Sequence, residues 1–134
     1  MEDHKEIAQR CFNAYMKFVN KKFGINISST LDYSITNSKR ANKKKTAGLA
    51  CRKVIGHDGV GHVYEYRISL HEEFLKHNLK SFLNDTIPHE IAHLVAYEKY
   101  ARYDIKIAGH GPEWQDIMRI MGIKPEKYHK MTLG

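Results

Sequence analysis

Residues 89–96 read His-Glu-Ile-Ala-His-Leu-Val-Ala, so two histidines and a glutamate stand within an otherwise apolar stretch. A helix that is apolar on nearly all sides is typically buried. Imidazoles and a carboxylate in such a helix are costly to bury unless they have partners. The sequence therefore predicts a buried helix with a polar centre, and a fold that gives this centre something to bind.

A metal ion would satisfy that centre. His89 and His93 are four positions apart, so on a helix they lie on one face with Cβ atoms roughly 6 Å apart. They can bind one zinc ion at Zn–N distances of about 2.0–2.1 Å. Glu90 follows the first ligand, where its carboxylate can reach water at the metal without being a ligand. This pattern predicts a Zn²⁺ site with Glu90 as the catalytic base, which is the chemistry of a hydrolase.

The third ligand is less strictly fixed by the spacing. His110 lies in Gly-His-Gly-Pro-Glu-Trp, seventeen positions after His93, and its flanking glycines allow a tight backbone path back towards the helix. Glu98 and Asp104 are competing candidates. Three protein ligands leave one position open for water, as catalytic zinc requires. The longer HExxHxxGxxH pattern is absent, which argues against a metzincin arrangement.

Periodicity outlines the other elements. Apolar residues at helical spacing predict a helix from about 4 to 22 that ends at Gly24. Alternating segments predict strands, and a glycine-rich segment predicts a turn. The expected strands are Leu31–Ile35, Ala47–Ile55 and His62–Leu70, with a turn at Gly56–Gly61 and a short helix at 71–77.

The helix that carries the histidines should begin near an N-cap at Asn84 or Asp85, with Pro88 in its first turn, and run to about Tyr103. Pro112 should start a last helix that ends at Gly122. The core face of that last helix would be formed by Trp114, Ile117, Met118 and Met121.

Together these elements predict an α+β fold with an N-terminal helix, a small three-stranded antiparallel sheet, the HExxH helix and a C-terminal helix. With 134 residues and no internal repeat, we expect a single domain over residues 1–134. The strand Val63–Leu70 is a candidate edge to which an extended substrate can add as a further strand.

The chain is basic, with a formal net charge of +7. Within seven positions stand the five candidate nucleic-acid-binding residues Lys39, Arg40, Lys43, Lys44 and Lys45. Such a cluster binds phosphates independently of sequence, or it is simply a solvated loop. Both interpretations stay open at this point.

Only two cysteines occur, and neither belongs to a CxxC pair, so a cysteine zinc ribbon is excluded and a reducing compartment is expected. No apolar run approaches the ~20 residues of a membrane span, and the N-terminus does not resemble a secretion signal. We expect a monomer that is cytoplasmic, or nucleoid-associated or nuclear if it binds DNA, with no membrane partner.

The segment Thr86-Ile-Pro-His-Glu-Ile-Ala-His-Leu-Val, followed by Gly109-His-Gly-Pro-Glu-Trp, resembles the SprT-like metalloprotease family, which includes the Spartan proteases. The resemblance is strongest from about 84 to 121. It implies a zincin-like fold, His110 as the third zinc ligand and Trp114 packed behind it. It also implies a substrate class, namely proteins bound or crosslinked to DNA. Many members continue into a cysteine-rich zinc-binding module, and residues 1–134 contain no such cysteine motif.

The implied activity is that of a zinc endopeptidase in which Glu90 takes the proton from the attacking water and passes it to the leaving amine. Tyr97, Tyr100 and Tyr103 are candidates to stabilise the oxyanion, and the sequence does not choose among them. Two alternatives remain. One is a general metallopeptidase that ignores nucleic acid, and the other is a non-enzymatic DNA-binding module with a structural metal.

Overall fold

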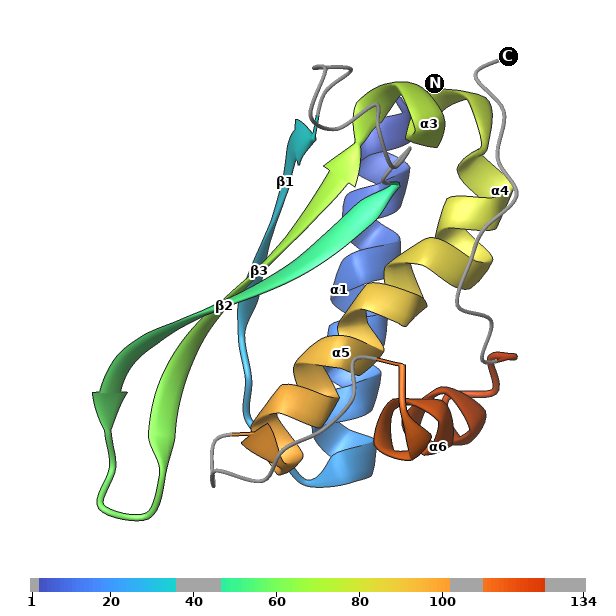
Figure 1. Cartoon of the computed structure of the whole chain (residues 1–134). Helices are drawn as coiled ribbons and strands as arrows, with labels where there is room; N and C mark the ends of the chain where they lie inside the picture. The colour runs from blue at the N-terminus through green and yellow to red at the C-terminus, as the bar shows by residue number, and fades with distance from the viewer. Residues whose placement is uncertain (1–2, 36–46, 102–109, 125–134) are drawn as a thin grey trace.

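The protein has a mixed α+β architecture in which helices cover one face of a small sheet (Figure 1). The computed structural model describes residues 3–35, 47–101 and 110–124. The helices are α1 (His4–Phe23), α3 (Glu72–His77), α4 (Leu79–Ser81), α5 (Ile87–Lys99) and α6 (Pro112–Ile120), and a π-helical turn, η1, spans Phe82–Thr86. The strands are β1 (Ser29–Ile35), β2 (Gly48–His57) and β3 (His62–His71). The expected α+β class is therefore confirmed.

Helix α1 is amphipathic and well capped. The side chain of Asp3 accepts hydrogen bonds from the first backbone N–H groups, and Gly24 ends the helix in the left-handed region with φ 62°. Its buried residues recur at helical spacing and form one face, made of Ala8, Phe12, Met16 and Val19. This face packs on α5, and the predicted N-terminal helix is thus confirmed.

The sheet has the order β1-β3-β2 and is mixed. β2 and β3 form an antiparallel hairpin whose turn contains Gly59 at φ 89°. β1 runs parallel to β3, so the prediction of a purely antiparallel sheet is wrong. Alternation of apolar and polar residues specifies which face of a strand is buried, but it is the same for both strand directions. Direction is set by pairing with residues distant in sequence, which the pattern does not record.

β3 is the central strand, and this overturns its proposed role as a substrate-binding edge. Both of its sides are paired, so its backbone groups have no room for a further strand. Its alternation appears as expected in the burial of its side chains: Tyr66 and Ile68 are buried, whereas Glu65 and Arg67 are exposed. In the described sheet the edges are β1 and β2, and the β2–β3 hairpin extends past the helical layer (Figure 1).

Helix α5 lies at the centre of the fold, in contact with α1, α6, β2 and β3. All ten residues from Ile87 to Ala96 are buried, as the apolar surroundings of the histidines predicted. The expected N-cap at Asn84 or Asp85 is wrong, because both residues lie inside η1, which leads into α5 without a break.

Pro88 explains this π turn. Proline lacks an N–H, and its ring clashes with the carbonyl four residues back in a regular helix. Immediately before it the helix is wider, and the Ile87 N–H donates to the carbonyl of Phe82, five residues back. The helical backbone therefore continues from η1 into α5 across Pro88, and no separate N-terminus is formed there.

The last described helix follows the sequence prediction closely. α6 begins at Pro112, its residues Trp114, Ile117 and Met118 are buried, and Gly122 follows with φ 78°. α5 ends at Lys99, earlier than the predicted Tyr103, which lies outside the described residues.

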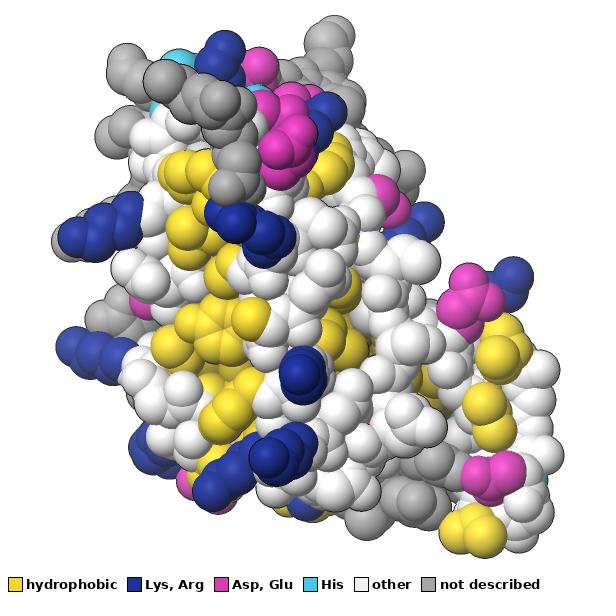
Figure 2. Space-filling model, turned by 180° about the vertical axis from the view of Figure 1, so that it is seen from behind, with side chains coloured by type: hydrophobic (Ala, Val, Ile, Leu, Met, Phe, Trp, Pro, Cys, Tyr) yellow, Lys and Arg dark blue, Asp and Glu magenta, His cyan; other side chains and the backbone are white. Residues whose placement is uncertain are grey.

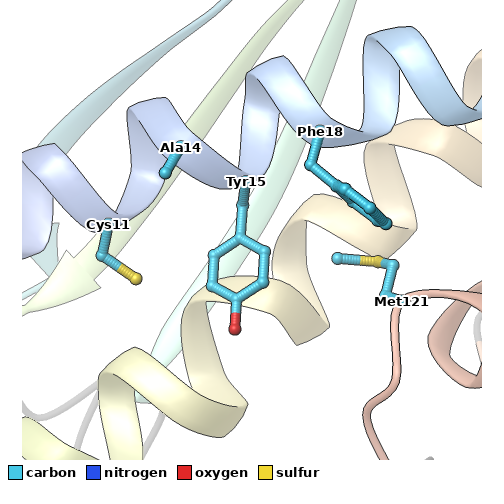
Figure 3. Close-up of a pocket in the computed structure, with 5 residues that line it drawn as sticks. All are labelled: Cys11, Ala14, Tyr15, Phe18 and Met121. Carbon is cyan, nitrogen blue, oxygen red and sulfur yellow. The ribbon is translucent and has the colours of Figure 1, made fainter.

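Seen from behind, the molecule shows apolar side chains gathered along the region of α1, with Lys and Arg side chains around them (Figure 2). An open apolar pocket of about 280 Å³ lies there. It is lined by Cys11, Ala14, Tyr15 and Phe18 from α1 together with Met121 (Figure 3). Both cysteines are free thiols.

None of the helices in the described ranges has both the length and the apolar character that crossing a membrane requires.

Candidate metal centre

The helix α5 presents His89 and His93 side by side. Their ring centroids are 5.1 Å apart, and their residues are only 4% and 8% exposed. The two residues are one helical turn apart, so their side chains leave the same face of α5. Both imidazoles therefore meet within the fold, where the sequence pattern placed them.

His110, immediately before α6, completes a cluster of three imidazoles. Its Nε2 lies 3.1 Å from Nε2 of His89, and its ring centroid is 4.9 Å from that of His93. One ring nitrogen from each histidine lies within 4.8 Å of the others, and among the described residues this is the one such group of three metal-ligating side chains. Of the competing third ligands, Glu98 accepts a hydrogen bond from Tyr66 instead, and Asp104 lies outside the described residues.

The cluster fits a metal ion. Two nitrogens bound tetrahedrally at about 2.0–2.1 Å are about 3.3 Å apart, close to the separation of His89 and His110. Burial, and then the neighbouring charge of His110, lower the pKa of His93 to about 4. Its imidazole is therefore neutral near pH 7, which is the form that binds a metal. The three histidines are thus close enough, and of the right chemistry, to hold a divalent ion.

Glu90 stands beside this cluster with its carboxylate enclosed. The residue is 7% exposed, and its Oε2 lies 3.8 Å from Nε2 of His89. Burial raises its pKa to about 8, although a hydrogen bond from the Ala50 backbone N–H acts in the opposite direction. A carboxyl group with a pKa near neutrality can both accept and release a proton.

Strand β2 forms the wall against which Glu90 packs. Gly48 approaches so closely that a Cβ there would lie 3.2 Å from Cγ of Glu90 and 3.1 Å from Cγ2 of Thr86. A glycine inside a strand often marks such a close approach. The sequence pattern gives no role to Gly48 or to Ala50, because β2 is distant from Glu90 along the chain.

Trp114 contacts all three imidazoles. Its ring centroid lies 4.7 Å from that of His89, 5.6 Å from His93 and 4.9 Å from His110. Its Nε1–H donates to the backbone carbonyl of His89 at 3.2 Å. The structure thus places this side chain behind the cluster, where it ties α6 to α5.

The next residue of α6 holds the third histidine. Nε2 of Gln115 donates to the backbone carbonyl of His110 at 3.0 Å. Oε1 of Gln115 in turn accepts from Arg119 at 3.4 Å, and Arg119 is paired with Asp116 at 3.0 Å. The sequence motifs do not include Gln115 among the candidate site residues. Its only signal was its position directly after Trp114.

Of the three tyrosines considered for oxyanion stabilisation, Tyr97 is the one that the structure places against the cluster. Its ring is nearly parallel to that of His93, with a centroid separation of 6.2 Å. Burial raises the pKa of Tyr97, the charge of Arg52 lowers it and that of Glu90 raises it, so the hydroxyl stays protonated and able to donate. Tyr100 is partly buried against the core, and Tyr103 lies outside the described residues.

The five predicted nucleic-acid-binding residues, Lys39, Arg40, Lys43, Lys44 and Lys45, also lie outside the described residues. Their proposed contact with phosphates therefore stays a prediction from the sequence.

Comparisons with known proteins give one consistent family. The model of the SprT-like family matches residues 8–132. Protein SprT of Pseudomonas savastanoi pv. phaseolicola and that of Pseudomonas aeruginosa are each 38% identical to the chain over 72 residues, and that of Pseudomonas fluorescens is 35% identical over 72 residues. Each match covers 53% of this chain and 42% of the relative, so the chain matches less than half the length of these relatives. No solved structure matches it.

Proposed function

Because the chain belongs to the SprT-like family, we propose that it is a zinc-dependent endopeptidase that cleaves proteins bound or crosslinked to DNA. The observation that carries the peptidase part is the enclosed carboxylate of Glu90 beside the three histidines. A structural metal site needs no base. An ionisable carboxyl group buried without a catalytic task would cost stability, and the fold instead gives it a close-fitting wall.

In this proposal His89, His93 and His110 hold the zinc ion. Bound there, zinc would lower the pKa of water towards ~7 and polarise the carbonyl of the peptide. Glu90 accepts the proton of the attacking water and passes it to the leaving amine, and its raised pKa suits both transfers. Tyr97 is the best-placed described tyrosine to donate a hydrogen bond to the developing oxyanion.

The DNA part of the proposal rests on the family and on charge. The net charge of +7 and the basic cluster between 39 and 45 favour a polyanionic partner. A general metallopeptidase would share the centre and would cleave unfolded protein whether or not DNA is present. A non-enzymatic module would keep the metal and cleave nothing.

One experiment separates these three functions. Zinc content is measured first, and cleavage is then followed on an unfolded protein and on a DNA-bound protein, with and without single-stranded DNA. We expect bound zinc, cleavage stimulated by DNA, and a loss of roughly 10²–10⁴-fold in rate for Glu90→Gln with zinc retained. Cleavage that ignores DNA would leave only the general peptidase. Bound zinc with no cleavage under any condition would refute the enzyme.

A further inference from the structure

Arg52 extends the stack of rings beside the histidine cluster. Its guanidinium lies 4.4 Å from the ring centroid of Tyr97 and 5.1 Å from that of Tyr64, and the residue is exposed. The ring of Tyr97 in turn lies nearly parallel to that of His93. The order His93, Tyr97, Arg52 therefore leads from the metal centre outwards to a positive charge at the surface.

Strand β2 brings the same arginine near the catalytic carboxylate. Ala50 donates its backbone N–H to Glu90, and Arg52 is two residues further on the same strand. Side chains two residues apart in a strand lie on one face, separated by about 7 Å. A peptide bond held beside Glu90 would thus have one of its neighbouring residues within reach of the guanidinium.

The charge of Arg52 has no acidic partner within the ranges that the structure describes. By contrast, Arg67 pairs with Asp32 at 3.4 Å and Arg119 with Asp116 at 3.0 Å. A guanidinium that rests on aromatic faces is fixed in place, while its five N–H donors remain suited to a carboxylate. An exposed and oriented cation with no acidic partner in the described ranges is suited to bind an anionic group of the substrate.

We propose that Arg52 is a specificity-determining residue that binds the carboxylate of an Asp or Glu side chain in the protein substrate, a few positions from the bond that is cleaved. This inference rests on the proposed peptidase function. It selects a protein carboxylate over a DNA phosphate because Arg52 is two residues from Ala50 on β2, and the backbone N–H of Ala50 donates to Glu90, beside which the cleaved peptide bond would bind.

The test is a cleavage-site profile on a library of peptides of mixed sequence, recorded with and without single-stranded DNA. For the wild-type protein we expect Asp and Glu to be enriched at one fixed position relative to the cleaved bond. Arg52→Gln should lose this enrichment, with kcat/KM reduced about tenfold to a hundredfold more on an acidic peptide than on the matched Gln peptide. Arg52→Lys should keep the preference, and Arg52→Glu should shift it towards Lys and Arg.

Arg67→Gln is the matched control, because it removes the same charge from the adjacent strand at a residue already paired with Asp32. Its profile should equal that of the wild type. Zinc content and the melting temperature of each variant report whether the fold and the centre are intact. These two measurements separate a loss of specificity from a loss of structure.

Three results would contradict the proposal, and each has a different meaning. A wild-type protein that cleaves peptides without any acidic preference refutes the role of Arg52 and leaves the peptidase standing. If Arg52→Gln keeps the wild-type profile but loses stimulation by single-stranded DNA, Arg52 binds phosphate and the carboxylate proposal is wrong. If the wild-type protein cleaves no peptide at all, the peptidase function fails and this inference fails with it.

Discussion

The indole of Trp114 donates its N–H to the backbone carbonyl of His89, and thereby joins the last described helix to the helix that carries two of the three histidines. The same ring contacts all three imidazoles. One side chain on α6 therefore affects both the packing of two helices and the geometry of the centre.

Replacing Trp114 should weaken both the packing of α6 on α5 and the binding of zinc. Trp114→Phe keeps an aromatic ring but removes the hydrogen bond, so we expect the free energy of unfolding to fall by at least about 1 kcal/mol and the zinc dissociation constant to rise. Chemical denaturation and competitive zinc titration measure the two effects. Ile117→Val, on the same buried face of α6, should cost about 0.5–1.5 kcal/mol without changing zinc affinity. Equal zinc affinity in wild type and Trp114→Phe would contradict the role of the indole.

Gln115 should affect zinc affinity, because its side chain holds the backbone of His110. Gln115→Leu keeps the approximate length of the side chain but removes the donor to that carbonyl, so the backbone of His110 loses this restraint. We expect zinc affinity to fall by up to about tenfold, at the lower end of the effect of residues that orient ligands. Gln9→Leu on α1, where Gln9 donates to Asn13, makes the same chemical change elsewhere and should have no effect. Restored affinity in Gln115→Glu, whose ionised side chain cannot donate, would exclude the hydrogen bond as the cause.

Gly48 should be required for the position of the Glu90 carboxylate. In Gly48→Ala the new methyl group would press on Cγ of Glu90 and on Thr86, so one of them must move by a few tenths of an ångström. We expect peptide cleavage to fall by about 10- to 100-fold while zinc stays bound, because small misplacements of a reacting group are costly. Gly56→Ala, on the same strand with open space around it, is the control. Similar activities for the two variants would show that Glu90 tolerates the shift.

Cys11 should be an unreactive thiol. Burial raises its pKa to about 11, and its Sγ–H donates to the carbonyl of Leu83 at 3.5 Å. In Cys51→Ser, alkylation at pH 8.5 should be roughly a hundredfold slower in the folded than in the denatured chain, whose thiol has a pKa of about 8.5. The stabilisation from burying the neutral thiol is complete below that pH and is lost as pH rises through about 11. A folded-state alkylation rate with its midpoint near pH 8.5 would disprove this burial.

Sequence periodicity predicted the helices and strands because it records which side of each element is buried. The spacing of His89 and His93 and the start of α6 at Pro112 follow from rules within one helix, and the structure agrees with them. The parallel pairing of β1 with β3 depends on residues far apart in sequence, which a local pattern cannot specify. The π turn before Pro88 could not be predicted for a different reason. A proline within an apolar helical pattern is equally compatible with the first turn of a new helix.

The residues around the centre also fall into those that a local sequence pattern predicts and those that only tertiary packing brings there. His89, Glu90 and His93 form a local pattern, and His110 and Trp114 lie in a second one. Gly48, Ala50 and Arg52 reach the centre only because β2 packs against α5. No spacing along the chain relates them to the histidines, so only a three-dimensional arrangement could reveal them.

The order of the strands also has a consequence for how the chain reaches its folded state. β2 and β3 are joined by a tight turn, so their pairing closes a small loop and needs little conformational entropy. In the described sheet β1 pairs with β3, and Ser29 pairs with Tyr66, 37 positions further along the chain. This contact therefore closes a far larger loop. We therefore expect the hairpin to form first. The wall that will hold Glu90 is then built from the most local contacts of the sheet, before the first strand arrives.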